Sequence, residues 1–456
     1  MKKFKENTIC SISTKKGESA ISVIRISGPK SKDICKKIFI NKQIKKISDF
    51  KPNKIYLGKI VDNNKILDEV ILSYFQNPKS YTGEDVIEIS CHGSEYIQNS
   101  IIQLLIKKGC SLAKRGEFTL RAFLNGKLDL SQAESVANLI SSKNEKSHDF
   151  AMKQMRGGYS KEIQSLRSQL IKFGALIELE LDFSTEDVEF ANRQQLIELL
   201  SKIQIKLKKL INSFKFGNAI KKGIPIAIIG PPNSGKSTLL NKILNEEKAI
   251  VSEIKGTTRD TIEETFVIEG FEFRFIDTAG IRNTRNKIEK IGIQKTHKKI
   301  NEAAIVLYLF DVSEFVKEKF EENIKSLIEK KSNVIFIANK IDLLEEIKIN
   351  TDQEIIYSSL IKNKGLNEIL ASILEKTKKW ELTNQNFVIT NQRHFESMTK
   401  TLKSVESVFL GIESDISGEL LSIDIKEALN HLGEITGEIT NEQLLDSIFR
   451  DFCIGK

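Results

Sequence analysis

The chain has 456 residues, which is too long for one hydrophobic core, so two to four domains are expected. The composition, with 40% hydrophobic residues, no apolar N-terminal segment and no apolar run near the roughly 18 residues of a membrane span, predicts a globular protein. The five cysteines are scattered, which argues against a disulfide scaffold or a zinc site and predicts a cytoplasmic location. The net charge of +9 is compatible with a nucleic-acid partner, but the lysine-rich composition of the whole chain also explains it.

The first 120 residues predict a domain of strands with one or two helices. Apolar runs bounded by turn residues predict strands at 21–28, 54–61, 68–75 and 85–93, and the clearest helix is 96–107. From about residue 122 the pattern is helical. Ser131-Gln-Ala-Glu134 has the form of a capping box, and long charged helices continue to about residue 215.

Residues 222–380 alternate apolar strands with helical segments, which is typical of a parallel sheet with helical crossovers. The predicted strands are IPIAIIG, FEFRFID, AAIVLYLFD and NVIFIANK. Helices return after 381, where Phe395, Met398, Leu402, Val405 and Phe409 recur at helical spacing and Thr440-Asn-Glu-Gln443 predicts the cap of a last helix. The α/β part is therefore expected to be inserted into an all-α domain.

A phosphate-binding loop, Gly230-Pro-Pro-Asn-Ser-Gly-Lys-Ser237, follows the first of these strands and precedes a helix. Its glycines let the backbone N–H groups face a phosphate, Lys236 neutralises the β- and γ-phosphates, and the Ser237 hydroxyl ligates Mg²⁺. Strand, loop and helix in this order predict a nucleotide site.

The later motifs select guanine. Asp277-Thr-Ala-Gly280 ends the second predicted strand, where its carboxylate reaches Mg²⁺ through water, and the segment Gly256–Asp260 supplies Thr258 to the metal as a switch. Asn339-Lys-Ile-Asp342 ends the last strand, and an aspartate there accepts from both N1–H and the exocyclic amine of guanine. Ser358 and Ser359 fit the loop that supports the base. Together these motifs predict a GTP hydrolase.

The position after Gly280 lacks the glutamine that orients the attacking water in Ras-like enzymes. Ile281 stands there, and Arg282, Arg285 and Glu289 are the nearby polar candidates. Each of them is equally compatible with a solvated charge in a switch segment.

Beyond the nucleotide motifs, the chain resembles the MnmE (TrmE) family of tRNA-modification GTPases over essentially its whole length. The resemblance rests on Asn233 in the phosphate loop, on GESAISVIRISGP, SYTGEDVIEISCHG, RGEFTLRAFLNGKLDLSQAESV, GTTRD and ITNQRH, and on the ending CIGK. It implies an α/β Ras-like P-loop G domain inserted in an all-α helical domain, preceded by an α+β tetrahydrofolate-binding domain. The expected ranges are 1–121 for the N-terminal folate-binding and dimerisation domain, 122–219 and 381–456 for the two parts of the helical domain, and 220–380 for the G domain.

The same resemblance implies potassium-dependent hydrolysis. Asn233 and backbone carbonyls of Ser252, Ile254 and Thr257 would hold K⁺, Ser237 and Thr258 would hold Mg²⁺, and Glu289 would position the water, with Lys236 as the other catalytic residue and Arg282 as a further candidate. The expected GTP-binding set is Asn233, Ser234, Gly235, Lys236, Ser237, Thr238, Ser252, Glu253, Ile254, Lys255, Gly256, Thr257, Thr258, Asp277, Thr278, Ala279, Gly280, Asn339, Lys340, Asp342, Ser358 and Ser359.

The family resemblance also implies a folate site and two partners. Arg25, Glu88, Lys127 and Lys456 would bind a 5-formyl- or methylene-tetrahydrofolate, because an arginine and lysines suit the carboxylates of its glutamate tail. Cys453 is a candidate thiol for handling the one-carbon unit. The absence of a GxGxxG motif fits a separate FAD-dependent partner, MnmG (GidA), with which a homodimer would add a carboxymethylaminomethyl-type group to C5 of the tRNA wobble uridine.

Two other readings remain open at this point. A ribosome-assembly GTPase of the Era or Der type would carry a KH-like domain with a GxxG loop, whereas Gly433-Glu-Ile-Thr-Gly437 has the wrong spacing and the tail reads as helical. A membrane-acting GTPase of the dynamin sort would need a basic amphipathic or hydrophobic insertion segment, which the sequence lacks.

Overall fold

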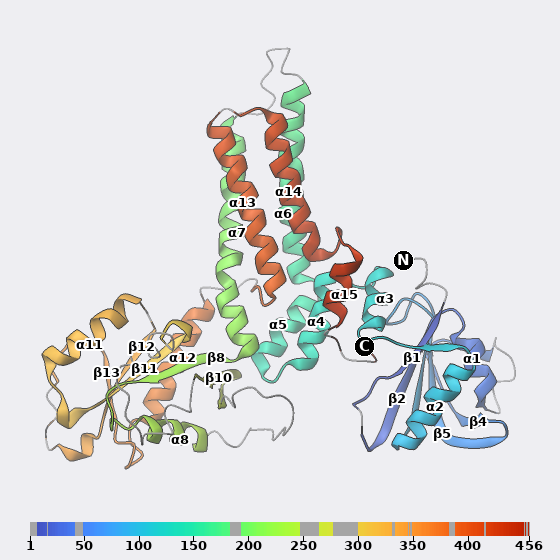
Figure 1. The fold of residues 1–456 in the computed structure, drawn as a ribbon, viewed down its shortest axis with the longest axis horizontal. Helices are drawn as coiled ribbons and strands as arrows, with labels where there is room; N and C mark the ends of the chain where they lie inside the picture. The colour runs from blue at the N-terminus through green and yellow to red at the C-terminus, as the bar shows by residue number, and fades with distance from the viewer. Residues whose placement is uncertain are drawn as a thin grey trace. The chain divides into compact units, whose positions relative to one another are not determined.

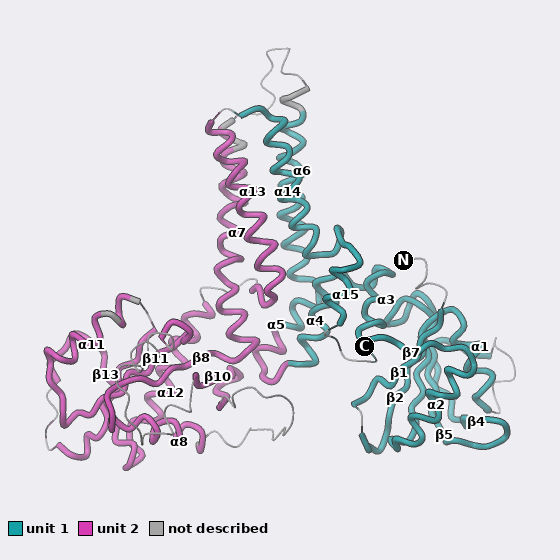
Figure 2. The backbone as a smooth tube through the Cα atoms, viewed as in Figure 1, with its two compact units in different colours: residues 1–141, 151–191, 415–456 teal, residues 142–150, 192–414 magenta. Residues whose placement is uncertain are grey.

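The computed structural model describes residues 7–15, 17–41, 49–182, 193–246, 264–276, 300–330, 333–344, 346, 349–382, 388–414, 416–450, 452 and 455. The chain forms two compact units (Figure 2). The first comprises residues 1–141, 151–191 and 415–456, and the second comprises residues 142–150 and 192–414. In the described ranges, no helix is both long and apolar enough to span a membrane.

The first unit begins with a β-sheet that carries helices on one face (Figure 1). In its described residues the strand order is β3-β4-β5-β6-β2-β1-β7, antiparallel except for the β1–β7 pair. The strands are β1 (Thr8–Ile12), β2 (Ser19–Ser27), β3 (Phe39–Ile40), β4 (Lys54–Asp62), β5 (Lys65–Phe75), β6 (Val86–Gly93) and β7 (Cys110–Leu112). Helices α1 (Ser31–Ile38) and α2 (Glu95–Lys107) share one apolar core with the sheet.

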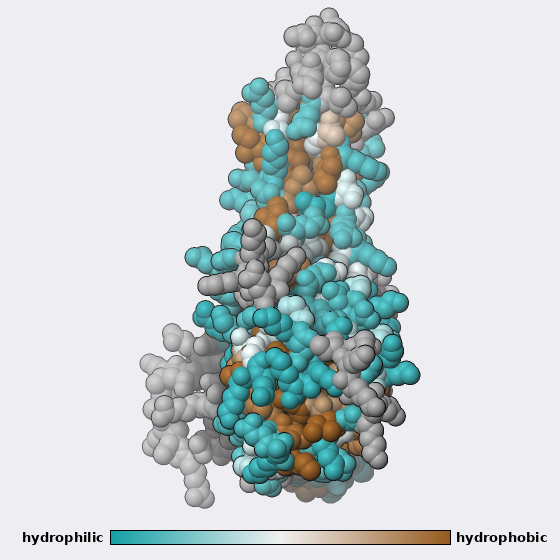
Figure 3. Space-filling view, turned by 90° about the vertical axis from the view of Figure 1, so that its right-hand side faces the viewer, coloured by the Kyte–Doolittle hydropathy of each residue, from teal (hydrophilic) through white to brown (hydrophobic). Residues whose placement is uncertain are grey.

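The opposite face of this sheet exposes large apolar side chains. Strand β4 turns Tyr56 and Ile60 into the core, so Ile55 and Leu57 point outward and are 72% and 65% exposed. Ile71 of β5 is 44% exposed and lies directly opposite Leu57. Figure 3 shows apolar surface gathered in the lower part of the face that it presents. A continuous apolar row on a sheet face is typical of a contact surface.

The first unit continues as helices. They are α3 (Glu117–Leu124), α4 (Leu130–Ser141), α6 (Gly158–Asp182), α14 (Gly418–Thr436) and α15 (Glu442–Arg450), while α5 (Glu145–Met155) belongs to both units in part. Helices α6 and α14 pack along each other, and α15 packs on α3. The C-terminal helices therefore pack against segments that lie before the G domain in the sequence.

Two predicted helix caps are wrong by one or two residues. Helix α4 begins before Ser131, and the reciprocal cap joins Asp129 to Gln132: Asp129 Oδ1 accepts from Gln132 N, and Gln132 Oε1 accepts from Asp129 N, both at 2.9 Å. At α15, Asn441 Oδ1 accepts from Leu444 N at 2.8 Å, so Asn441 is the cap in place of Thr440. Aspartate and asparagine are strong caps, and the geometry of the preceding turn decides which neighbour is used.

The second unit contains two long paired helices and an α/β sheet. Helices α7 (Arg193–Lys222) and α13 (Gln392–Glu413) pack along each other. In the described residues the sheet order is β13-β12-β11-β8-β10-β9, with only β9 antiparallel to its neighbour. The strands are β8 (Ile224–Ile229), β9 (Thr265–Ile268), β10 (Phe271–Phe275), β11 (Ile305–Asp311), β12 (Val334–Asn339) and β13 (Ile355–Tyr357).

Helices cover both faces of this sheet. Apolar residues of α8 (Lys236–Glu246) and α12 (Leu366–Leu382) join the core on one face, and those of α11 (Lys317–Lys330) join the core on the other. Short 3-10 turns, η4 (Val312–Glu314) and η5 (Ile341–Leu343), follow β11 and β12. The predicted Ras-like α/β domain, inserted in sequence between helical segments, is confirmed.

Candidate functional site

The phosphate-binding loop connects β8 to α8 with a backbone that only special residues adopt. Gly230, Asn233 and Gly235 have φ of 139°, 59° and 103°. A Cβ on Gly230 would come 1.9 Å from Leu309 O of β11, and one on Gly235 would come 2.3 Å from Asn339 Nδ2. Glycine is therefore required at both positions, and asparagine is among the few other residues that tolerate positive φ at a third. The N-terminus of α8 follows at once, which favours an anion in this loop.

The side chain of Lys236 lies across the loop. Its Nζ donates to Gly230 O at 3.0 Å and to Pro231 O at 2.5 Å. Ser237 is next on α8, so the ammonium and a hydroxyl are held at the same helix N-terminus. This is the pair of groups that phosphates and their Mg²⁺ require.

Asn339 connects the phosphate loop to the predicted base-binding loop. It is 4% exposed, and its Nδ2 donates to Ser234 O at 2.9 Å. Its Oδ1 accepts from Leu360 N at 3.2 Å. Both ends of the amide are thus used within the protein, so Asn339 fixes the relative position of two loops.

The side chain of Asp342, the predicted base contact, is held by a hydrogen bond from a neighbouring loop. Its Oδ1 accepts from Ser359 Oγ at 2.5 Å, and this hydrogen bond is the main reason that the pKa of Asp342 lies below its usual value. Ser358 is fully buried behind it, and its N–H donates to Ala338 O at 2.8 Å. The carboxylate is consequently ionised and oriented at the carboxyl end of β12.

Sequence reasoning missed Asp311, the partner of Lys340. Lys340 takes a left-handed conformation with φ of 67°, and its Nζ lies 2.6 Å from Asp311 Oδ2. Burial alone would raise the pKa of Asp311, but the hydrogen bonds from Lys340 and Ser313 prevail and lower it. The available signal was an aspartate ending the apolar run AAIVLYLFD, at the same sheet edge as the nucleotide motifs.

Several predicted site residues lie outside the described residues. They are Ser252, Glu253, Ile254, Lys255, Gly256, Thr257, Thr258, Asp277, Thr278, Ala279, Gly280, Arg282, Glu289, Cys453 and Lys456. Of the remaining nucleotide residues, the structure brings the phosphate loop and the base-binding loop together through Asn339.

In the first unit, two of the predicted folate residues form one ion pair. Arg25 and Glu88 are cross-strand neighbours on β2 and β6, and Arg25 Nε and Nη2 lie 2.9 and 2.8 Å from Glu88 Oε1. The guanidinium carbon lies 5.2 Å from the ring centre of Tyr81 and 5.7 Å from that of Phe118. The pair is thus held beside two aromatic rings on the sheet face away from α1 and α2.

Lys127 lies against the same loop as Tyr81. Its side chain is exposed and lies beside Gly83, where an added Cβ would approach its Cγ to 3.2 Å. Sequence reasoning missed Arg121 of α3, which is 1% exposed and forms ion pairs with Glu84 of this loop at 3.1 Å and with Glu117 of its own helix at 3.0 Å. The available signal was the i, i+4 spacing of Glu117 and Arg121.

The described part of the C-terminal tail returns to the sheet. Gly455 O accepts from Ser13 Oγ at 3.2 Å, and Phe452 O accepts from Arg115 Nε at 2.9 Å. A Cβ on Gly455 would come 2.2 Å from Ile12 O, so the backbone packs tightly there. The tail is therefore attached near the end of β1.

Two family models and the curated relatives match this chain over nearly its full length. A family model described as "MnmE helical domain" matches residues 130–453, and one described as "GTP-binding protein TrmE N-terminus" matches residues 8–127. The "tRNA modification GTPase MnmE" of Flavobacterium johnsoniae is 52% identical over 466 residues, and that of Christiangramia forsetii is 50% identical over 470 residues, each covering 99% of both chains. Among solved structures, the FeoB G-domain from Methanococcus jannaschii is 26% identical, covers 34% of this chain and 97% of that chain, and has a TM-score of 0.26.

Proposed function

The chain belongs to the MnmE family of tRNA modification GTPases, and from this premise we propose a potassium-dependent GTP hydrolase that modifies C5 of the tRNA wobble uridine. Membership makes it a GTP hydrolase that acts in tRNA modification. The observation that carries the proposal is the phosphate loop, whose Gly230 and Gly235 leave no room for a side chain, joined through Asn339 to the loop of Asp342 and Ser359.

The described residues fit Mg²⁺ and the triphosphate. The oxygen of Ser237, at the start of α8, suits a hard cation, and Thr258 would provide a second hydroxyl. When bound, the metal neutralises phosphate charge. Lys236, already placed across the loop, would turn its ammonium from Gly230 O and Pro231 O to the β- and γ-phosphates.

The conformation of Asn233 supports the proposal that it is a K⁺ ligand. The residue is exposed and has a left-handed conformation within the phosphate loop. Its amide oxygen would therefore be accessible to a cation beside the phosphates. Carbonyls of Ser252, Ile254 and Thr257 would complete the site. A cation there supplies the positive charge that an arginine supplies elsewhere. Glu289 would order the attacking water, and Arg282 is the further candidate for charge stabilisation.

The Arg25–Glu88 pair supports a folate site. Glu88 occupies Nε and Nη2 of Arg25, and in the described residues Nη1 has no acceptor, so a ligand carboxylate has a donor there. Glu88 would also accept from the pterin, while Lys127 and Lys456 would add charge for the glutamate tail. The flat rings of Tyr81 and Phe118 beside Arg25 suit a flat heterocycle. Cys453 would assist with the one-carbon unit.

The complete proposal includes tRNA, the flavin-dependent protein MnmG and a second copy of this chain. In the cytoplasm, a homodimer joined through the N-terminal domain would act with the flavin-dependent protein MnmG to add a carboxymethylaminomethyl-type group to tRNA. The carbon would come from a tetrahydrofolate derivative bound at the Arg25–Glu88 pair.

The experiment is mass spectrometry of tRNA nucleosides from cells that lack the protein. We expect the carboxymethylaminomethyl-type uridine to disappear and to return when the unaltered chain is supplied. Lys236→Ala should fail to restore it, because the phosphates lose their ammonium partner. An unchanged nucleoside profile in the deficient cells would refute the proposed modification.

A further inference from the structure

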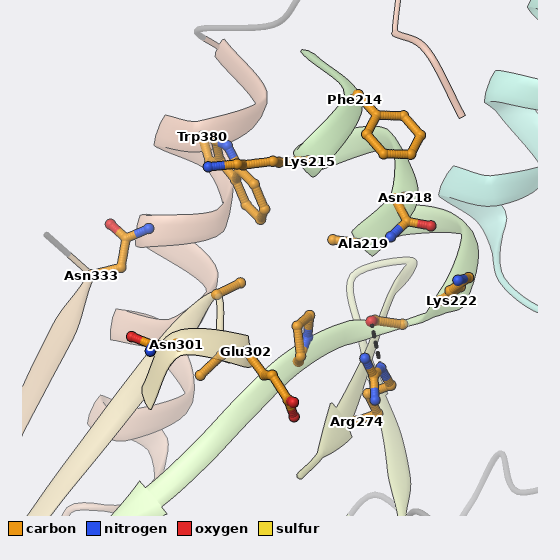
Figure 4. A pocket seen from close by; sticks show the side chains of 14 residues that line it. Phe214, Lys215, Asn218, Ala219, Lys222, Arg274, Asn301, Glu302, Asn333 and Trp380 are labelled. Atoms are coloured by element: carbon orange, nitrogen blue, oxygen red, sulfur yellow. Dashed lines mark hydrogen bonds between the residues drawn. The ribbon is translucent and has the colours of Figure 1, made fainter. Parts of the chain in front are cut away.

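A cavity lies at the sheet edge opposite the nucleotide motifs. Its volume is about 490 Å³, and its lining includes Pro225, at the start of β8, and Ala304 and Asn333, which immediately precede β11 and β12 (Figure 4). The carboxyl ends of the same strands lead to Gly230, Asp311 and Asn339. The cavity is therefore distinct from the GTP site, and its size is that of a small-ligand pocket.

The cavity is rich in cations. Lys215, Asn218 and Lys222 recur at three- and four-residue intervals and so form one stripe of α7, and Arg274 of β10 joins them (Figure 4). Glu302 is the one acidic residue in the described lining. Within the described residues, neither Lys215 nor Lys222 has a carboxylate partner.

Helix electrostatics explain only part of this charge. Lys222 lies in the last turn of α7, where a cation offsets the helix dipole. Lys215 is two turns earlier, beyond the reach of that effect. Arg274 Nε donates to Gly223 O at 3.2 Å, which holds its guanidinium at the cavity wall. The arrangement favours a bound anion.

The remaining lining suits a nucleobase. Asn218, Asn301 and Asn333 offer amide groups, which both donate and accept hydrogen bonds as base edges require. Trp380, the chain's single tryptophan, packs edge-on against Phe216 with ring centres 5.0 Å apart and remains half-buried at the cavity. An indole ring is a platform on which a splayed-out base stacks.

We propose that this cavity binds one unpaired nucleotide of tRNA, with the flanking phosphates at Lys215, Lys222 and Arg274 and the base beside Trp380 and the asparagines. The choice of tRNA as the occupant rests on the proposed function in tRNA modification. The cavity itself favours a ligand that combines a phosphate with a base. A free nucleoside monophosphate has the same chemistry, and the experiment separates the two sources.

The test uses the fluorescence of Trp380 in the full chain, titrated with purified bulk tRNA and, separately, with uridine monophosphate. We expect tRNA to quench the tryptophan, because a base stacks on its ring. The Lys215→Ala, Lys222→Ala double variant should bind tRNA at least about tenfold more weakly, with a salt slope smaller by about 1 to 2. Lys202→Ala with Lys209→Ala is the matched control, since these exposed lysines of α7 do not line the cavity and should leave affinity unchanged.

Asn218→Ala separates base recognition from charge. It should weaken tRNA binding while leaving the salt slope as it was, because no phosphate contact is lost. The proposed site would be overturned if the Lys215→Ala, Lys222→Ala variant and the control bound tRNA with equal affinity and equal salt slope. It would also be overturned if the unaltered chain bound uridine monophosphate tightly while the cavity variant kept the tRNA affinity of the unaltered chain. If the unaltered chain binds no tRNA, the premise and the site both fail, whereas binding that both lysine pairs leave intact removes the site alone.

Discussion

Asp342 and Asn339 are three residues apart, yet their side chains have different partners. Asn339 is buried between two loops, whereas Asp342 is half-buried and its carboxylate accepts a side-chain hydrogen bond from Ser359. Replacement of Asn339 would therefore disturb the loops themselves. Replacement of Asp342 changes the surface presented to a base and leaves the loops in place.

We expect Asp342→Asn to weaken GTP binding by about 10²-fold, because guanine loses a charged double acceptor. Xanthosine triphosphate, which has a carbonyl where guanine has its amine, should be bound better by the variant. Fluorescence titration measures the affinity of the variant for each of the two nucleotides. The control is Asp352→Asn, which replaces an aspartate outside the site. Equal GTP affinity in the variant and the unaltered chain would contradict the guanine site.

The sequence predicts the motif residues, but it does not predict their partners in the fold. The spacing of Asn339, Lys340 and Asp342 assigns them to a base-binding loop, whereas the Lys340–Asp311 pair joins residues that are distant in sequence and meet only when β11 and β12 align. The same holds for Arg25 and Glu88, which adjacent strands place opposite each other. Such side-chain pairs depend on the register between neighbouring strands, which a single sequence does not determine.

At the scale of elements, the phosphate loop is the part whose conformation its sequence determines most closely. Gly230 and Gly235 are required by contacts with β11 and β12, while Asn233 is exposed. Asn233 therefore has no packing role that would compete with a cation-binding one.

We expect GTP hydrolysis to be about 10²-fold faster in K⁺ than in Na⁺, a size typical of one stabilising group at a developing charge. Asn233→Ala and Asn233→Gly should both remove this difference and leave nucleotide binding largely intact. The glycine variant is the control for backbone strain, since it tolerates the positive φ of this position. Single-turnover hydrolysis in the two salts at equal ionic strength decides the matter, and a rate indifferent to K⁺ in the unaltered chain would favour Arg282 instead.

Elements with a strong period were predictable, and short ones were not. The predicted strands and the helix at 96–107 are confirmed by β2, β4, β5, β6 and α2. Strand β7 has only three residues and becomes a strand by pairing with β1, about 100 residues earlier. Too few residues lie in β7 for an alternation to show, so its pairing depends on tertiary structure.

For the whole molecule, the open face of the N-terminal sheet is the feature that bears on assembly. Leu57 and Ile71 face each other on adjacent strands, and Ile55 extends the row, while α1 and α2 cover only the other face. Burying one such side chain stabilises an interface by about 1.5–3 kcal/mol. In a two-fold interface the same residue is buried on both copies, so it contributes twice. This face therefore offers apolar surface for the proposed homodimer.

We expect the unaltered chain, of 51.7 kDa, to sediment at twice that mass at micromolar concentration, and Leu57→Lys with Ile71→Lys to sediment as the monomer. In a two-fold interface the two substitutions bring four ammonium groups together without partners, and unpaired buried charge is costly. Ile205→Lys with Leu410→Lys is the matched control, because these side chains are 66% and 61% exposed on α7 and α13, outside the sheet. GTP affinity measured on the same samples should be unchanged, since the nucleotide loops lie in the other unit. If the sheet variant remains a dimer while the helix variant dissociates, then the helices and not the sheet join the two copies, and the apolar row must have another partner.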